Sequence, residues 1–332
     1  MTVEVEHIRE RIADVNRVLI VCHDYPDPDG LASAWGVKRL FTDRFGIEAD
    51  ITFGGFIGRA GNRAMVDLLR IELLPILQVD YDHYDFVVMV DTQPGTGNNA
   101  YAGERPVDLV IDHHPSCSRA EAVESCIRTE CGSTTAIVTE LLFKSGMDID
   151  PHLATALFLG IKTDTLALGR EFCSQDWEYY LKLFPMIDQK LLSRIERPDL
   201  QPEHFRILAE AMEKTSVYET VAFSHLGTVR FPEAIAEYAD ILLPLEHIEW
   251  VLCTGVFRDE LFFSIRMRNA AGNAGDVARA IVKGLGTAGG HEEIAGGKTQ
   301  VDSRDLDEVA QELKKRFLDE LGVAAENWKP LY

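Results

Sequence analysis

The chain has 332 residues, a net charge of −21 and a hydrophobic content of 46%. This length suits two domain cores, and the acidic balance argues against a long nucleic acid as partner, because such binding needs lysine and arginine to displace counterions. The acidic first residues and the short apolar runs match neither a signal peptide nor a membrane span, so we expect a cytoplasmic protein without membrane contact.

The first half of the chain alternates short apolar strands with amphipathic helices. The expected strands are 17–22, 85–90 and 108–111, and the expected helices are 32–42, 62–73, 133–145 and 151–163. Continuous apolar strands that alternate with helices are typical of a parallel sheet covered on both faces. We therefore predict an α/β fold with a mostly parallel sheet for residues 1–173.

The second half has a different pattern. Residues 174–220 are rich in helix-forming sequence and contain three prolines, and we expect them to connect two domains. A smaller α+β domain is predicted for residues 221–332, with strands at 221–226, 250–257 and 260–267, helices at 276–284 and 304–321, and a glycine-rich loop at 284–297. The six cysteines form no CxxC pair, so we interpret them as reduced packing thiols.

Polar residues of metal-binding type follow each of the three expected strands of the first half. His23, Asp27 and Asp29 come after the first strand, Asp91 after the second, and Asp112-His113-His114 after the third, while Asp164 ends a predicted helix. Each has an ordinary explanation as a turn or cap residue. Because the carboxyl ends of parallel strands meet at one edge of a sheet, however, we expect these groups to converge. Carboxylates and imidazoles without thiolate favour manganese or magnesium over structural zinc.

This series resembles the four motifs of the DHH phosphoesterase family, which occur here in the family's order. The pattern His23-x-x-x-Asp27-x-Asp29-Gly30 is followed by Asp91, by Asp112-His113-His114 and by Asp164. Near the C-terminus, Ala288-Gly289-Gly290-His291 with Ile294-Ala-Gly resembles the glycine-histidine motif of the first DHH-associated domain. The resemblance covers nearly the whole chain.

The resemblance implies two Mn²⁺ ions, with Mg²⁺ or Co²⁺ as possible substitutes. His23, Asp27 and Asp91 would hold one ion, and the other would be held by Asp29, Asp91, His113 and Asp164, so that Asp91 bridges the two. Asp112 would orient a ligand histidine, and His114 would donate to the substrate phosphate. In the second domain, Arg266, Gly289, Gly290 and His291 would bind substrate across a cleft.

The implied activity is hydrolysis of short nucleotide phosphate esters such as nanoRNA, linear dinucleotides and pAp. Two departures from the nanoRNA- and pAp-hydrolysing members put the substrate in question. The sequence after Asp164 is Thr-Leu-Ala-Leu-Gly-Arg where a glycine and an aromatic residue are usual, and Ala288 replaces a glycine.

Alternatives remain open at this point. A RecJ-like exonuclease on single-stranded DNA is disfavoured by the acidity and length of the chain. A non-catalytic nucleotide sensor is disfavoured because it would not need two metals. A pyrophosphatase of the same superfamily is disfavoured by the loop at Ala288.

Several weaker signals stay ambiguous. Residues 131–134 could present N–H groups to an anion or simply cap a helix at Ser133. Arg59, Arg170, Arg268 and Lys298 could contact substrate or be ordinary surface charges. The expected partner is a short oligonucleotide or nucleotide rather than a long duplex, and a homodimer is compatible with the sequence.

Overall fold

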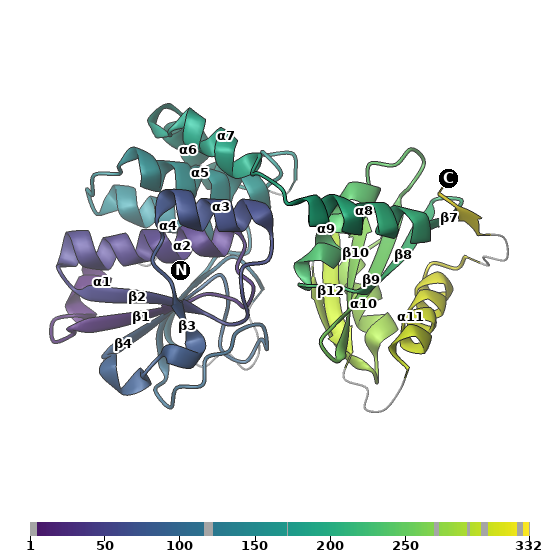
Figure 1. Ribbon diagram of the computed structural model, residues 1–332. Coiled ribbons are helices and arrows are strands. Elements are labelled where there is room, and N and C mark those ends of the chain that lie inside the picture. Colours follow the sequence, from purple (N-terminus) through teal and green to yellow (C-terminus); the bar gives the residue numbers. More distant parts are fainter. Residues whose placement is uncertain are drawn as a thin grey trace. The chain divides into compact units, whose positions relative to one another are not determined.

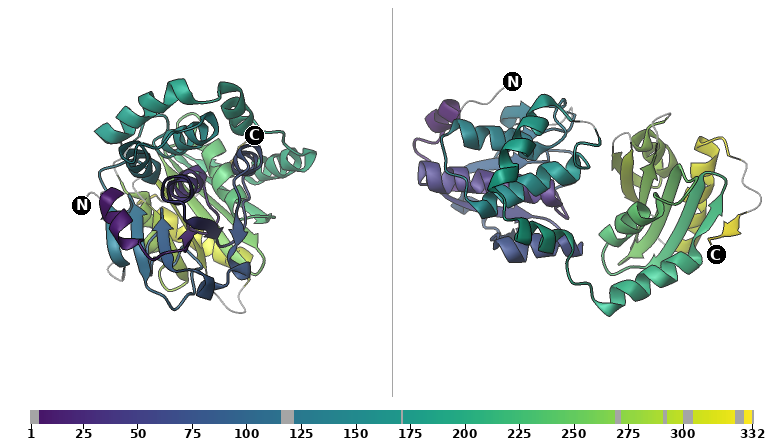
Figure 2. Two further views of the ribbon diagram at one scale, coloured as in Figure 1. Left: turned by 90° about the vertical axis from the view of Figure 1, so that its left-hand side faces the viewer. Right: turned by 90° about the horizontal axis from the view of Figure 1, so that it is seen from above.

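The computed structural model describes residues 5–115, 122–170, 172–268, 272–290, 293–299, 305–323 and 328–331. The chain divides into two compact units, Met1–Pro198 and Asp199–Tyr332, each built on a sheet of its own (Figures 1 and 2). The expected connector at 174–220 is shared between them, with its first part in the first unit and its last part in the second. None of the helices in the described ranges is both long and apolar enough to cross a membrane.

The first unit contains a six-stranded sheet in the order β3-β2-β1-β4-β5-β6, and all of its neighbouring strands run parallel. The strands are β1 (Arg17–Val21), β2 (Glu48–Phe53), β3 (Leu74–Pro75), β4 (Phe86–Val90), β5 (Val107–Asp112) and β6 (Ala122–Ile127). The order reverses direction at β1, whose two neighbours are β2 and β4. Parallel sheets bind ligands at the carboxyl ends of the strands beside such a reversal.

Helices pack on one face of this sheet and share a hydrophobic core with it. They are α1 (Val5–Arg11), α2 (Pro28–Arg39), α3 (Ala60–Leu69), α4 (Thr134–Lys144), α5 (Pro151–Asp164), α6 (Ser174–Leu183) and α7 (Gln189–Glu196), and a π-helical segment, η1 (Leu40–Phe45), extends α2. The opposite face is covered by Val79 and Tyr81 from the segment around the short helices η2 (Ile76–Gln78) and η3 (Tyr81–His83), and by Tyr101 from the segment between β4 and β5. The predicted α/β class is confirmed, although this second face is covered differently from the expectation.

Close packing of α4 against α5 depends on a glycine. A Cβ atom on Gly160 of α5 would lie 2.3 Å from Oγ1 of Thr135 in α4. No real Cβ contact is this short, so only glycine allows the two helices to approach so closely. This packing positions the C-terminal end of α5, where Asp164 lies.

The second unit has a seven-stranded mixed sheet in the order β11-β12-β10-β9-β8-β7-β13, in which only β8 and β9 pair in parallel. Its strands are β7 (Ser216–Tyr218), β8 (Val221–Thr228), β9 (Trp250–Phe257), β10 (Glu260–Met267), β11 (Gly286–Gly290), β12 (Ile294–Thr299) and β13 (Lys329–Pro330). Helices α10 (Ala274–Val282) and α11 (Leu306–Glu320) share a core with one face, and α8 (Pro202–Lys214) and α9 (Glu233–Leu242) with the other.

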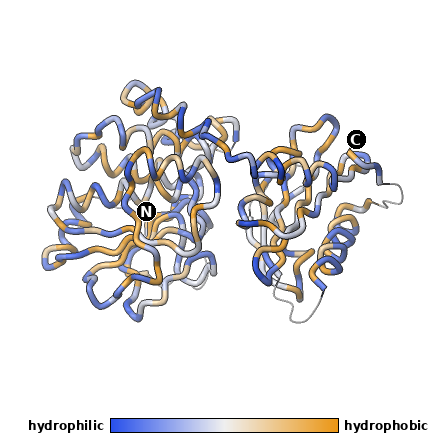
Figure 3. The backbone as a smooth tube through the Cα atoms, viewed as in Figure 1, coloured by the Kyte–Doolittle hydropathy of each residue, from blue (hydrophilic) through white to orange (hydrophobic). Residues whose placement is uncertain are grey.

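Most expected elements of both units are present with ends shifted by a few residues. Figure 3 shows the hydrophobic residues concentrated along the central strands, as their continuous apolar sequences indicated. The prediction of a glycine-rich loop at 284–297 was wrong, because β11 and part of β12 lie there. A Cβ atom on Gly297 would lie 2.7 Å from the ring of Phe263 on β10, so this glycine permits close strand packing instead of a turn.

Candidate metal centre

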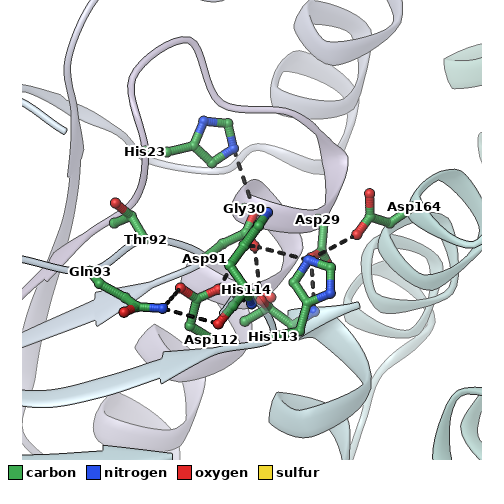
Figure 4. A network of polar contacts seen from close by, with 12 residues as sticks. His23, Asp29, Gly30, Asp91, Thr92, Gln93, Asp112, His113, His114 and Asp164 are labelled. Carbon is green, nitrogen blue, oxygen red and sulfur yellow. Dashed lines mark hydrogen bonds and ion pairs between the residues drawn. The ribbon is translucent and has the colours of Figure 1, made fainter. Parts of the chain in front are cut away.

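The polar residues expected to converge do so at the carboxyl edge of the first unit's sheet (Figure 4). His23 follows β1, Asp91 directly follows β4, and Asp112 is the last residue of β5. Asp164 arrives from the end of α5. The site therefore lies beside the reversal of strand order at β1, where open parallel sheets place their ligands.

The loop after β1 is shaped by the start of α2. Asp27 is the N-cap of this helix, and its Oδ1 accepts hydrogen bonds from the backbone N–H groups of Asp29 at 2.9 Å and Gly30 at 3.0 Å. A Cβ atom on Gly30 would lie 3.0 Å from Nε2 of His23 and 3.5 Å from Oδ2 of Asp91. Glycine at this position thus leaves room for the imidazole and the carboxylate to face each other.

Asp91 lies between two groups of potential ligands. Its backbone has a left-handed conformation with φ of 57°, which turns the chain sharply after β4. Oδ2 of Asp91 lies 3.5 Å from Nε2 of His23, and Oδ1 lies 3.8 Å from Nε2 of His113. The two carboxylate oxygens therefore face different histidines.

Two sets of three side chains could each hold a cation. In one set, donor atoms of His23, Asp27 and Asp91 all lie within 4.8 Å of one another. In the other, donor atoms of Asp29, His113 and Asp164 meet the same limit, and Nε2 of His113 is 3.2 Å from Oδ2 of Asp164. Asp91 also groups with His113 and His114, which connects the two sets.

The N-terminus of α4 holds two of these carboxylates. Asp29 is buried, and its two oxygens accept hydrogen bonds of 2.8 Å from the backbone N–H groups of Thr134 and Thr135. Oγ1 of Thr134 donates a further 2.8 Å bond to Oδ1 of Asp91. The interpretation of Ser133 as a helix cap is confirmed, and the first N–H groups of α4 are bonded to the side chain of Asp29. The role of Thr134 was missed, because a threonine at the first position of a helix gives no functional signal.

Asp112 contacts His114. Its Oδ1 lies 2.8 Å from Nδ1 of His114, and Oδ2 accepts a 2.8 Å bond from Nε2 of Gln93. Nδ1 of His113 instead lies 3.2 Å from the carbonyl oxygen of Cys131. That Asp112 orients a ligand histidine stays a prediction, and Gln93 is an additional polar residue that the sequence did not indicate.

The electrostatics of the cluster fit divalent cations. Burial, with a contribution from Asp91, raises the pKa of Asp29 to about 8, and burial also raises the pKa values of Asp91 and Asp164. Carboxylates this crowded ionise together only when positive charge compensates them. Burial and the neighbouring His114 lower the pKa of His113, which favours the neutral ring that binds metals. Oxygen and imidazole donors without a thiolate suit manganese or magnesium.

The residues expected to bind substrate lie in the second unit. Arg266 is only 5% exposed, and its guanidinium forms an ion pair with Asp240 and a 2.7 Å bond to Oγ of Ser264. Gly289 and Gly290 end β11, and His291 lies outside the described residues. The substrate role of all four stays a prediction.

The four weaker basic candidates have different surroundings. Arg59 is the N-cap residue of α3, and its charge contributes to lowering the pKa of Asp27. Arg268 donates to the carbonyl oxygen of Leu243, and Lys298 pairs with Glu260 at 2.9 Å. Arg170 lies in the turn after Asp164, where its backbone N–H donates to the carbonyl oxygen of Thr165. Among these, Arg59 and Arg170 lie in the first unit with the carboxylate cluster.

Comparison with known proteins gives one family match and several relatives. Residues 17–161 match the model of the DHH family, N-terminal domain. The chain is 33% identical over 320 residues to an uncharacterized protein of Methanocaldococcus jannaschii, covering 93% of this chain and 65% of that protein. It is 24% identical over 156 residues to a Streptococcus pyogenes protein named "Probable manganese-dependent inorganic pyrophosphatase", covering 46% of this chain and 50% of the relative.

A solved structure shares the fold of both units. An exopolyphosphatase-related protein from Bacteroides fragilis superimposes with a TM-score of 0.74 and 16% identity, covering 95% of each chain. At this identity the likeness concerns the fold alone. The chain spans about two thirds of the length of the first relative above and half that of the second.

Proposed function

Residues 17–161 form an N-terminal domain of the DHH family, and from this membership we propose that the chain is a two-metal phosphoesterase acting on short nucleotide phosphate esters. The observation that carries the proposal is the position of Asp91, whose two oxygens face the histidines of two different ligand sets. A carboxylate shared in this way suits a pair of cations that act on one phosphate.

The ligand sets divide naturally between the two cations. His23, Asp27 and Asp91 would hold one, and Asp29, His113 and Asp164 would hold the other. Asp91 would also bind the second cation, as the resemblance to the DHH motifs implies. When bound, such cations lower the pKa of a coordinated water and neutralise charge on the phosphate. The hydrogen bonds from Thr134 and Thr135 to Asp29, and from Thr134 to Asp91, would fix both carboxylates in place before substrate arrives.

His114 would donate a hydrogen bond to the substrate phosphate. Its Nδ1–H donates to Asp112, and this bond, with the charges of Asp91 and Asp112, outweighs burial and raises the pKa of His114 to about 9, so the protonated ring also carries a proton on Nε2 that it would donate. Gln93 supports this arrangement because it donates both to Asp112 and, at 3.1 Å, to the carbonyl oxygen of His114. In the second unit, Arg266, Gly289, Gly290 and His291 would bind substrate phosphate.

Short substrates are favoured by the charge of the chain. Cations compensate the phosphate that they contact, but each further phosphate of a longer strand would meet a protein whose net charge is −21. We therefore expect catalytic efficiency to be highest for substrates of one to about five nucleotides and to fall for longer strands. The substrates that we propose are pAp, linear dinucleotides and nanoRNA.

The test is a hydrolysis panel with Mn²⁺ at fixed salt. It includes pAp, pApA, pGpG, a five-nucleotide RNA, single-stranded DNA of a few tens of nucleotides, and pyrophosphate. Highest kcat/KM for the short nucleotides supports the proposal. Efficiency that rises with strand length would favour an exonuclease on single strands, and hydrolysis of pyrophosphate alone would favour the activity named for the Streptococcus relative. Either outcome overturns the assigned substrate class.

A further inference from the structure

Two cysteines of the first unit lie face to face beside the candidate metal centre. Sγ of Cys131 is 3.3 Å from Sγ of Cys173, and both are free thiols in the structure. Cys131 is buried, whereas Cys173 is partly exposed and so accessible to a small reagent. The other described cysteines are all buried, namely Cys22, Cys126 and Cys253.

A single carboxylate holds the two cysteine-bearing loops together. Oδ2 of Asp176 accepts hydrogen bonds from the N–H groups of Gly132 at 2.7 Å and Cys173 at 2.9 Å, and Oδ1 accepts one from Oγ of Ser133 at 2.9 Å. Asp176 is fully buried, so these bonds are protected from water. These hydrogen bonds of Asp176 therefore hold the two thiols near each other. A disulfide has a sulfur separation of about 2.05 Å, which requires the two atoms to approach by only about 1.2 Å.

We propose that Cys131 and Cys173 form a reversible disulfide, with hydrogen peroxide or a related hydroperoxide as the oxidant. The Cys173 thiolate attacks a peroxide oxygen and becomes a sulfenic acid as hydroxide leaves. Cys131 then attacks the sulfenic sulfur, and the oxygen leaves as water. In total, two thiols and one hydrogen peroxide give one disulfide and two waters. A dithiol reductant restores the thiols by exchange.

The surroundings favour Cys173 as the first residue to react. Cys173 is partly exposed, whereas Cys131 is only 4% exposed, so the oxidant reaches the sulfur of Cys173 first. A thiolate, and not a thiol, is the nucleophile toward peroxide. The partly exposed cysteine thus reacts with the oxidant, and the buried cysteine resolves the intermediate.

The position of Cys131 connects this pair to the metal centre. Its carbonyl oxygen lies 3.2 Å from Nδ1 of His113, and two residues later Ser133 caps the helix whose first N–H groups hold Asp29. Drawing Cys131 toward Cys173 would move the backbone segment that orients His113 and Asp29. We therefore expect the oxidised protein to bind Mn²⁺ about tenfold more weakly, since loss of a contact that orients a metal ligand costs ten- to a hundredfold in affinity. This effect rests on the proposed function, whereas formation of the disulfide does not.

The experiment uses the full, metal-free chain, reduced and then exposed to a small excess of hydrogen peroxide. Mass spectrometry of proteolytic peptides should find 131 joined to 173 with the loss of two hydrogen atoms, and dithiothreitol should reverse it. Cys131→Ser and Cys173→Ser should each abolish the crosslink. Cys126→Ser, which changes a buried cysteine of the same unit, should keep it and serves as the matched control.

Three results would overturn the disulfide: sulfinic or sulfonic acid on Cys173 without a crosslink, a crosslink from either cysteine to Cys117, or free thiols on both cysteines after exposure to peroxide. Calorimetric titration with Mn²⁺, before and after oxidation, tests the coupling to the metal centre. Peroxide should weaken binding in the wild type and in Cys126→Ser but not in Cys173→Ser. A crosslinked protein with unchanged Mn²⁺ affinity would overturn the coupling. Disulfide formation could still be measured if the protein hydrolysed none of the substrates in the panel. Failure of the proposed function and failure of the disulfide can therefore be told apart.

Discussion

Oγ1 of Thr134 donates a 2.8 Å hydrogen bond to Oδ1 of Asp91, and both residues are almost completely buried. This bond joins the first residue of α4 to the carboxylate between the two ligand sets. It fixes one oxygen of Asp91 on the side of His113 and leaves the other to face His23. The sharing of one carboxylate thus depends on a hydroxyl from a neighbouring helix.

Replacing Thr134 with valine should weaken the metal centre without disturbing the fold. Valine keeps the shape of threonine and the backbone N–H that binds Asp29, but it removes the donor to Asp91. We expect Mn²⁺ affinity to fall by about tenfold, as is usual when a contact to a metal ligand is lost. Calorimetric titration measures the change, and Thr134→Ser, which retains the hydroxyl, should bind nearly as the wild type does. Equal affinity in the valine variant would show that the bond does not support metal binding.

Asp91→Asn should be among the most damaging single substitutions. Asparagine tolerates the left-handed backbone found at this residue, so the change removes charge without adding strain. Because Asp91 would serve both cations in the proposed centre, we expect fewer than two bound Mn²⁺ ions and a fall in turnover of roughly 10³-fold or more. Metal analysis and steady-state kinetics test this. Asp67→Asn, at an exposed carboxylate of α3, is the control; two tightly bound ions in Asp91→Asn would contradict the shared role.

Stability of the metal-free protein should fall as pH rises from about 6.5 to 8. The pKa of Asp29 is raised to about 8 by burial, and that of His23 is raised to about 10 by Asp27 and Asp91, which outweigh the opposing effect of burial. In this window both groups hold more proton in the folded than in the unfolded chain, so raising the pH favours unfolding. Thermal unfolding after chelation should show this decline, and saturating Mn²⁺ should raise the midpoint and reduce the slope. A metal-free midpoint that increases over this range would refute the prediction.

Leu166→Gly should stabilise the first unit. Leu166, Ala167 and Leu168 follow Asp164 with φ values of 48°, 56° and 65°, a left-handed turn that disfavours side chains. Since the side chain of Leu166 is 56% exposed, its removal sacrifices little burial. We expect a gain of about 0.5 kcal/mol after allowing for the flexibility of glycine in the unfolded chain. Urea unfolding of the full chain, followed by fluorescence of Trp35 and Trp177, measures the gain.

Leu181→Gly provides the opposite control for that measurement. Leu181 is 50% exposed but lies inside the regular helix α6, where glycine costs about 1 kcal/mol. The two variants should therefore shift the unfolding midpoint in opposite directions. A loss of stability in both would mean that the turn after Asp164 is not strained.

The sequence predicted the edge of the sheet where the polar residues meet, because that prediction needs only strand order and strand ends. Three apolar runs, each followed by a potential ligand, sufficed to bring His23, Asp91 and His113 together. Strand β2 was missed because its sequence, Glu-Ala-Asp-Ile-Thr-Phe, starts with polar residues and lacks a continuous apolar run. Its pairing with β1 becomes evident only in three dimensions.

Contacts between distant segments were beyond the reach of sequence patterns. Asp112 precedes both His113 and His114, so spacing alone does not decide which ring it contacts. The glycines of β11 and β12 carry no side-chain periodicity. Gly286 and Gly290 pack closely against the backbone of β12, and Gly297 packs against Phe263 of β10. The thiol pair of Cys131 and Cys173 similarly joins residues 42 positions apart without a sequence motif.

The bonds between Asp29 and the start of α4 also bear on how the metal centre is made during synthesis. They connect residues separated by 105 and 106 positions in the chain. A nascent chain that ends before residue 134 carries His23, Asp27 and Asp91 but has nothing to hold Asp29. Assembly of the complete ligand arrangement must therefore wait until α4 has left the ribosome and closed on α2, and Asp164 at the end of α5 follows later still. The first ligand set is therefore fully translated before the second, which is complete only when Asp164 has been added.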